Sequence, residues 1–208
     1  MIKSISTKIT DFFIGREAIN EEDRDIYLYG SEILISEILC TMITLGIGLF
    51  LGCFIKTIIY LIIYTMIRIY AGGYHAMSHK MCITIFNVLY VFFLAIVELT
   101  FYLKISGILC FSTIISVLII YRLAPVQDPR KILDEFELEK YRNKARRRTI
   151  FSGICVILTY FFIPFAKDEM GYGMIAICEV ALLVVIGYIK NKFTLFVAKK
   201  KIVIRGEL

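Results

Sequence analysis

Both histidines of the chain lie in one short polar stretch, which also contains a cysteine. His75, His79 and Cys82 follow Arg68 and a Gly-Gly pair within fifteen residues. Imidazole can remove the proton of a thiol, and the resulting thiolate is a strong nucleophile that nearby positive charge stabilises. These residue types predict a nucleophile–base pair with Cys82 as the nucleophile and Arg68 or Lys80 as the neighbouring charge.

The spacing does not decide which histidine is the base. On an unbroken helix, His75 and Cys82 share a face but stand about 10 Å apart along the axis, whereas direct proton transfer needs about 3 Å. His75 therefore requires a bend, for which Gly72-Gly73 supplies the backbone freedom. His79 would sit beside Cys82 on a helix, because it lies three residues earlier. Both assignments stay open at this point.

Two other interpretations compete with the nucleophile–base pair. His75, His79 and Cys82 recur at i, i+4 and i+7, so they could hold a metal ion on one helical face. Against this, Ala76 stands where the H-E-x-x-H motif of metalloproteases has its glutamate. The other interpretation is an interfacial turn without chemistry, in which Cys82 only packs in the core.

The composition indicates what kind of elements must position this stretch. Of the 208 residues, 59% are hydrophobic and only 20% are charged, whereas soluble proteins carry about a quarter charged residues. This excludes an ordinary soluble domain, a disordered chain and a collagen-like repeat. The six cysteines form no C-x-x-C pair, and no cofactor-binding fingerprint is present. We expect an all-α, polytopic integral membrane protein.

Six apolar segments are candidates for spanning helices, each of which needs about 20 mostly apolar residues. We expect them at about Ile33–Phe54, Thr57–Tyr70, Met81–Tyr102, Ile105–Leu123, Ile150–Ala166 and Met170–Tyr188. Only Ile55 and Lys56 separate the first two, which indicates a tight hairpin. The chain then forms one domain, 1–208, with an N-terminal arm at 1–30, a transmembrane core at 31–190 that includes a cytoplasmic loop at 125–148, and a basic tail at 191–208.

The distribution of basic residues predicts the orientation of these spans. With both termini in the cytoplasm, 21 of the 24 Lys and Arg residues lie on the cytoplasmic side. Only Lys56, Lys104 and Lys167 lie outside, a bias that the positive-inside rule predicts for a correct topology. We therefore expect a plasma-membrane protein whose histidine–cysteine stretch lies at the cytoplasmic boundary between the second and third spans.

Two segments outside the spans are predicted to be helical. In the arm, apolar residues at helical spacing indicate an amphipathic helix on the inner leaflet; they are Ile2, Ile5, Ile9, Phe12 and Phe13. In the loop, Asp128-Pro129 has the form of a helix start and opens a charged helix from Arg130 to about Arg148. This helix ends in Arg146, Arg147 and Arg148. That basic cluster either fixes the topology or docks an acidic partner or anionic lipid.

Three glutamates in or near the spans are candidates for pairing or function, because ionisable groups are costly in a membrane. Glu37 is expected to form a structural ion pair with Arg68. Glu98 and Glu179 are expected to lie too far toward the outer side to reach Cys82. Backbone N–H groups near the Gly-Gly pair or at the start of the third span are the candidates for stabilising an oxyanion.

The segment Arg68…Gly-Gly-Tyr-His75…Cys82, in a six-span chain of this length, resembles the accessory gene regulator protein B (AgrB-like) family. The resemblance covers essentially the whole chain. Members are membrane cysteine endopeptidases that process precursors of cyclic autoinducing peptides for quorum sensing. The resemblance implies His75 as the base, Cys82 as the nucleophile, and Arg68 and Gly73 as residues that support the site. It implies no role for His79.

The resemblance also implies a reaction and its partners. The enzyme would remove the C-terminal tail of an AgrD-like precursor peptide through a Cys82 thioester. It would then hand the acyl group to an internal Cys or Ser of the substrate, forming a cyclic thiolactone or lactone. Arg146, Arg147 and Arg148 are candidates for substrate binding. We expect membrane lipids and a second copy of the chain as partners, and no metal, cofactor or nucleic acid.

Two alternative functions remain beside this one. The first is a non-enzymatic membrane transporter or export subunit, and the second is a metal-dependent membrane protease. A transporter should place polar groups near mid-membrane on several helices. Here they gather at one predicted inner boundary, which favours an enzyme at the membrane surface.

Overall fold

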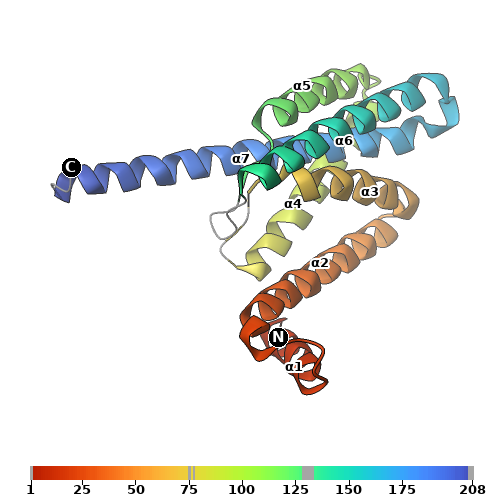
Figure 1. The fold of residues 1–208 in the computed structure, drawn as a ribbon. Helices are drawn as coiled ribbons and strands as arrows, with labels where there is room; N and C mark the ends of the chain where they lie inside the picture. Colours follow the sequence, from red (N-terminus) through yellow and green to blue (C-terminus); the bar gives the residue numbers. More distant parts are fainter. Residues whose placement is uncertain (1, 75, 77, 128–133, 206–208) are drawn as a thin grey trace.

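The computed structural model describes residues 2–74, 76, 78–127 and 134–205, and it describes side chains as far as Thr194. The described chain folds into helices, as predicted for the fold class (Figure 1). The α-helices are α1 (Ile2–Gly15), α2 (Arg24–Phe50), α3 (Phe54–Ala71), α4 (His79–Tyr102), α5 (Gly107–Leu123), α6 (Glu135–Phe162) and α7 (Lys167–Arg205). Short 3-10 turns at Glu21–Asp23 and Pro164–Ala166 precede α2 and α7.

Four helical segments within the described residues are long and apolar enough to cross a membrane. They are Glu21–Phe50, Phe54–Ala71, His79–Tyr102 and Pro164–Thr194. The apolar helix α5 has 17 residues and is shorter than these. Helix α6 joins a charged first half to an apolar second half. The protein is therefore a polytopic membrane protein, and the count of six spans stays a prediction.

The hairpin between the first two spans lies earlier than the sequence predicted. Helix α2 ends at Phe50 and α3 begins at Phe54, so the predicted break at Ile55-Lys56 is wrong. Gly52 has φ +71°, a conformation that only glycine adopts without strain. The Cys53 N–H then donates to the Gly48 carbonyl, 2.8 Å away, and closes the helix end.

One predicted boundary in the second half of the chain is also corrected. The charged helix and the fifth span are one continuous helix, α6, because no Gly or Pro separates Arg148 from Ile150. Asp134 caps this helix by accepting from the Glu137 N–H at 2.6 Å. The predicted start at Asp128-Pro129 lies outside the described residues. The backbone of α7 stays helical through the last predicted span and on to Arg205, so the tail continues α7.

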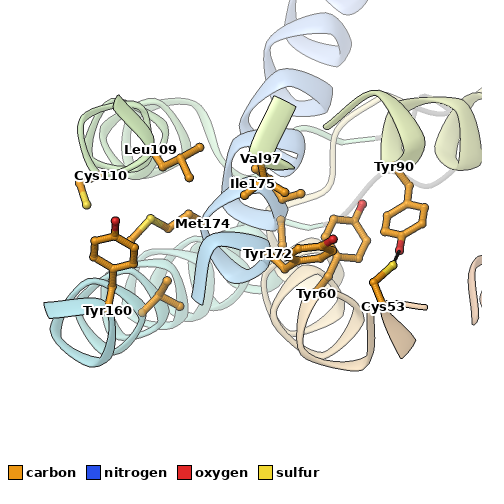
Figure 2. Packing of buried hydrophobic residues seen from close by; sticks show 12 residues of the cluster. Cys53, Tyr60, Tyr90, Val97, Leu109, Cys110, Tyr160, Tyr172, Met174 and Ile175 are labelled. Carbon is orange, nitrogen blue, oxygen red and sulfur yellow. Dashed lines mark hydrogen bonds between the residues drawn. The ribbon is translucent and has the colours of Figure 1, made fainter. Parts of the chain in front are cut away.

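Helix α7 is the central helix of the bundle. Of its apolar segment, 67% is buried, against 17–22% in the other three candidate spans. It packs against α3, α4, α5 and α6. Figure 2 shows Met174 of α7 directed toward Leu109 and Tyr160, whereas Tyr172 lies beside Tyr60 of α3. The surrounding helices expose their apolar residues outward, as expected for contact with lipid.

The N-terminal arm forms the predicted amphipathic helix. Helix α1 packs on α2, with Ser6 and Thr10 fully buried. Asp11 accepts a hydrogen bond from the Arg24 guanidinium at 2.8 Å. Large apolar side chains stay exposed on α1, namely Ile5, Ile9, Phe12 and Phe13. This exposed apolar face suits the membrane interface, and its place on the inner leaflet stays a prediction.

The far end of the bundle is fixed by a lysine between two carboxylates. The Lys56 ammonium at the start of α3 lies 3.9 Å from Glu98 of α4 and 3.8 Å from Asp168 of α7. The Tyr172 hydroxyl donates to Glu98 at 2.8 Å. Lys56 is one of the three lysines that the sequence placed outside. Because α3 runs from Lys56 to the histidine–cysteine stretch, the two polar groups lie at opposite ends of the bundle.

Candidate active site

A sharp turn follows α3 and leads toward the predicted catalytic residues. Its residues are Gly72, Gly73 and Tyr74, here called the glycine turn, and the two glycines have φ +63° and +125°. The Gly73 N–H donates to the Val126 carbonyl at 3.1 Å, and the Val126 N–H donates to Ala71 at 2.9 Å. The loop after α5 therefore fixes the glycine turn by backbone hydrogen bonds on both sides.

Helix α7 supports the glycine turn from its other side. The Tyr74 N–H donates to the Leu183 carbonyl at 2.8 Å. The Lys190 ammonium lies 4.9 Å from the centroid of the Tyr74 ring. One turn of α7 away from Leu183, Gly187 touches the backbone of Gly73. The central helix thus contacts the turn through a carbonyl, an ammonium and a glycine.

Arg68 clamps the glycine turn from within α3. Its guanidinium donates to the Gly72 carbonyl and, at 2.6 Å, to the Tyr74 carbonyl. A Cβ on Gly73 would overlap the Arg68 guanidinium and approach the Leu183 carbonyl to 2.9 Å. Arg68 and Gly73, to which the family resemblance assigned a supporting role, are therefore in direct contact. Any side chain at Gly73 would displace the clamp.

Cys82 lies in the first turn of α4 and is partly buried. Ser78 caps the helix: its hydroxyl accepts from the Met81 N–H at 3.3 Å and its carbonyl from the Cys82 N–H at 3.0 Å. The N-terminal end of a helix stabilises negative charge, which suits a thiolate nucleophile.

The structure describes only one of the two histidines. His75 lies outside the described residues. His79 is the first residue of α4, and its Nε2 lies 3.3 Å from the Glu32 carboxylate of α2. This contact ties the start of α4 to α2. Sequence reasoning missed Glu32, because it is 47 residues from His79 and no periodic pattern connects them.

The three glutamates do not all lie where the sequence predicted. Within the described residues, no ion pair joins Glu37 to Arg68, because the guanidinium folds back onto the glycine turn. Glu98 lies at the far end of the bundle, as predicted. Glu179 is fully buried in α7 and accepts a hydrogen bond from the Tyr60 hydroxyl at 2.5 Å.

The chain matches one family of known sequences over most of its length: the accessory gene regulator B family matches residues 6–188. The chain belongs to the accessory gene regulator B family. The resemblance carried by the histidine–cysteine stretch is thereby confirmed. No curated protein and no solved structure shows a significant match. Membership in the AgrB family implies processing of AgrD-like precursors of autoinducing peptides at the membrane.

The basic cluster that we considered for substrate binding in this AgrB-family protein does not form one patch. The Arg146 guanidinium donates to the Tyr121 carbonyl at 3.0 Å on α5. Arg148 turns the other way, donates to Met66 of α3 at 3.4 Å and lines an apolar groove of about 390 Å³ along α3. Only Arg147 of the three is exposed in the described structure. The helical spacing of about 100° per residue separates the three side chains.

The candidates for oxyanion stabilisation are reduced by the hydrogen bonds of the glycine turn. The N–H groups of Gly72, Gly73 and Tyr74 donate to Arg68, Val126 and Leu183 carbonyls respectively. None of the three is available to a substrate in this arrangement. The first turn of α4, which carries Cys82, is the remaining candidate named from the sequence.

Among the residues that the structure describes, no three His, Cys, Asp or Glu side chains gather as a metal site. The metal site considered from the sequence includes His75, which lies outside that set. All six cysteines are free thiols. For this AgrB-family protein, Cys82 is therefore a free, partly buried thiol at the start of α4.

Proposed function

We propose that this AgrB-family protein is a membrane cysteine endopeptidase that removes the C-terminal tail of an AgrD-like precursor and closes the peptide ring. Cys82 is the nucleophile and His75 is the base. The observation that carries the proposal is the position of Cys82, at the start of α4 and close in sequence to a glycine turn that three elements hold rigidly. The hydrogen-bonded glycine turn ends one residue before His75 in the sequence, and the capped first turn of α4 holds Cys82.

The first step of the proposed reaction is attack of Cys82 Sγ on the scissile carbonyl. His75 takes the thiol proton and then gives it to the departing amide nitrogen. The C–N bond breaks, a C–S bond forms, and the tail leaves with a new N-terminal amine. The precursor is then held as a thioester on Cys82.

In the second step, a thiol or hydroxyl of the bound precursor attacks that thioester. The proton of the attacking thiol or hydroxyl passes through His75 to Cys82 Sγ. The peptide then leaves as a thiolactone or lactone. Exchange of one thioester for another changes bond energy little, whereas forming a thioester from an amide is unfavourable. Departure of the tail or of the product must therefore drive the reaction toward thioester formation and ring closure. The partial burial of Cys82 supports the exclusion of water that would hydrolyse the intermediate.

The proposal places both termini and Cys82 on the cytoplasmic side. It is supported by the basic residues, because the predicted six-span topology puts 21 of the 24 on that side. The precursor would lie on the inner leaflet beside the exposed apolar face of α1. Labelling of Lys56→Cys with a membrane-impermeant maleimide, in a variant without the native cysteines, tests the orientation: labelling in intact cells supports it, and protection contradicts it.

The proposal also includes a homodimer, which rests on family membership. Chemical cross-linking in membranes followed by mass determination tests it. A cross-linked species of twice the chain mass that persists on dilution with lipid supports a dimer. A monomer alone contradicts it.

Co-expression with a precursor peptide tests the proposed reaction. The mass of the peptide is followed with the wild type and with Cys82→Ala, His75→Ala and His79→Ala variants. We expect loss of the tail with the wild type and with His79→Ala, and an intact precursor with the other two. Cleavage by Cys82→Ala would show that Cys82 is not the nucleophile. Loss of cleavage in His79→Ala, with His75→Ala active, would move the base to His79.

A further inference from the structure

An apolar groove lies on the outside of α3, beside α6, and takes no part in the proposed chemistry. Its volume is about 390 Å³, which falls within the range of pockets that hold small ligands. Leu61 and Ile69, at the two ends of its α3 wall, lie eight residues apart, or about 12 Å along the helix. The lining residues come from one face of α3 and from α6, namely Leu61, Ile62, Thr65, Met66, Ile69 and Arg148. The groove is therefore elongated and apolar, and Arg148 is its one charged lining residue.

An aromatic ring of α3 holds the charged residue at the groove. The Arg148 guanidinium lies 4.4 Å from the centroid of the Tyr70 ring and donates to the Met66 carbonyl at 3.4 Å. The Lys144 ammonium, one turn earlier on α6, lies 5.1 Å from the same centroid. Tyr141 of α6 also packs on Tyr70, with the ring centroids 5.6 Å apart. Tyr70 thus brings two cations together at the end of α3.

These two cations have no anionic partner in the described part of the chain. Neither Lys144 nor Arg148 forms an ion pair with a carboxylate there, and the groove is lined by no acidic side chain. Lys144 is exposed and Arg148 is partly buried. Two like charges beside one ring repel each other, and an anion that contacts both offsets this repulsion. The arrangement therefore favours an anionic ligand.

The apolar part of the groove indicates which anion this is. Helix α3 is one of the candidate membrane spans and packs against α6 (Figure 1). Ile62 and Ile69 of the groove are exposed, as on a surface that faces lipid. A phospholipid joins an apolar chain to a phosphate at one end, which matches an apolar groove with cations at one end. Guanidinium groups suit phosphate oxygens, and basic pockets between spanning helices bind anionic headgroups.

We propose that the groove between α3 and α6 binds an acyl chain of an anionic phospholipid, whose phosphate lies at Arg148 and Lys144. In the predicted topology α3 runs from Lys56 on the outer side toward the glycine turn, so this lipid belongs to the inner leaflet. The lipid joins α6 to the end of α3 that carries the glycine turn. The site is independent of the proposed function, because Cys82 does not line it.

Native mass spectrometry of the full chain tests the preference for an anionic headgroup. The protein is released from nanodiscs with equal amounts of phosphatidylglycerol, which is anionic, and phosphatidylcholine, which is zwitterionic. We expect the wild type to retain at least about fivefold more phosphatidylglycerol than phosphatidylcholine, the scale of one hydrogen bond to a charged group. Equal retention of the two lipids would overturn the proposal.

Variants at the groove test where the lipid binds. Arg148→Gln should abolish the excess of phosphatidylglycerol, and Lys144→Gln, at an exposed position, should lower it. Thr65→Trp fills the groove and keeps both cations, so it should lower the amount of retained phosphatidylglycerol. An unchanged excess in Arg148→Gln, or unchanged retention in Thr65→Trp, would overturn the proposal.

A matched control is available on the same helix. Arg142 is an exposed arginine of α6, six residues before Arg148 and therefore about 240° around the helix. Arg142→Gln removes the same charge from the protein and should retain both lipids as the wild type does. An equal loss of phosphatidylglycerol in Arg142→Gln and Arg148→Gln would show a general effect of net charge, and would overturn the site.

Photo-cross-linking in the same nanodiscs identifies the occupant of the groove. With p-benzoylphenylalanine in place of Thr65, we expect an adduct with the mass of phosphatidylglycerol in excess over phosphatidylcholine. The same residue in place of Met42, exposed on α2 where residues 25–50 contain no Lys or Arg, should give both lipids equally. An adduct of Thr65 with a second chain or a peptide in place of lipid would overturn the proposal. Because no precursor is needed, the result does not depend on whether Cys82 is the nucleophile.

Discussion

Gly187 of α7 is in direct contact with the backbone of Gly73, 114 residues earlier in the chain. A Cβ at position 187 would lie 2.6 Å from the Gly73 carbonyl carbon and 2.6 Å from the Tyr74 nitrogen. Backbone atoms cannot move aside as a flexible side chain can. The central helix and the glycine turn therefore meet at a distance that only glycine permits. This contact sets the position of the turn relative to α7.

Gly187→Ala should therefore reduce precursor processing at least tenfold, with a loss of stability of about 1–3 kcal/mol typical of overpacking. The added methyl group pushes the glycine turn away from α7 and lengthens the hydrogen bond from Tyr74 to Leu183. The rate of tail release in membranes and the Tm of the purified protein measure the two effects. Gly46→Ala is the control, because a Cβ there meets no atom within 4 Å. Unchanged processing with Gly187→Ala would show that this contact does not position the site.

Arg68→Lys should also abolish most of the processing activity. The planar guanidinium reaches two carbonyl groups of the glycine turn at once, whereas the ammonium of lysine lacks this fork. We expect at least about a tenfold loss of rate with the positive charge retained. Arg142→Lys, at an exposed position on α6, should leave the rate unchanged. Full activity of Arg68→Lys would mean that charge alone, and not the bidentate geometry, is required.

The helices were predictable from the sequence, whereas several of their ends were not. Long apolar runs predict spanning helices wherever the segment is uniform, as in Met81–Tyr102, which falls within α4. The first hairpin was misplaced because Lys56 was taken as the break, although Gly52 provides the positive φ angle. The two parts of α6 were separated by a change in polarity between Arg148 and Ile150. A helix continues through such a change when no residue breaks it.

The family resemblance named Arg68 and Gly73, but the contact between them was not predicted. Arg68 and Gly73 are five residues apart, and their contact follows from the end of one helix. The contacts made by Gly187 and by Glu32 connect distant segments, and no residue pattern marks either partner. Glu179 was expected to lie too far toward the outer side to reach Cys82, and this stays a prediction. Its hydrogen bond to Tyr60 depends on how α3 and α7 are aligned, for which the sequence holds no signal. Tertiary packing determines these relationships.

Loss of the helix cap before the nucleophile should slow the reaction. Ser78→Ala removes the oxygen that accepts from the Met81 N–H, at a cost of about 1 kcal/mol for an N-cap. We expect a several-fold lower rate of Cys82 alkylation by iodoacetamide and of precursor cleavage. Ser78→Asn retains a capping oxygen and should restore both rates. Identical rates for the Ala and Asn variants would show that capping does not control the position of Cys82.

The attachment of α2 to α4 depends on a polar contact inside the bundle. The Thr44 hydroxyl donates to Oδ1 of the Asn87 side chain at 3.0 Å. The Asn87 side-chain amide donates to the backbone carbonyl of Ile83 at 2.9 Å. Asn87→Leu removes this interhelical bond and should lower the free energy of unfolding by about 1 kcal/mol, the usual scale within membranes. Thr84→Val, which loses only a bond to its own helix, is the control. Equal stability of the two variants would show that the Thr44–Asn87 bond does not stabilise the attachment of α2 to α4.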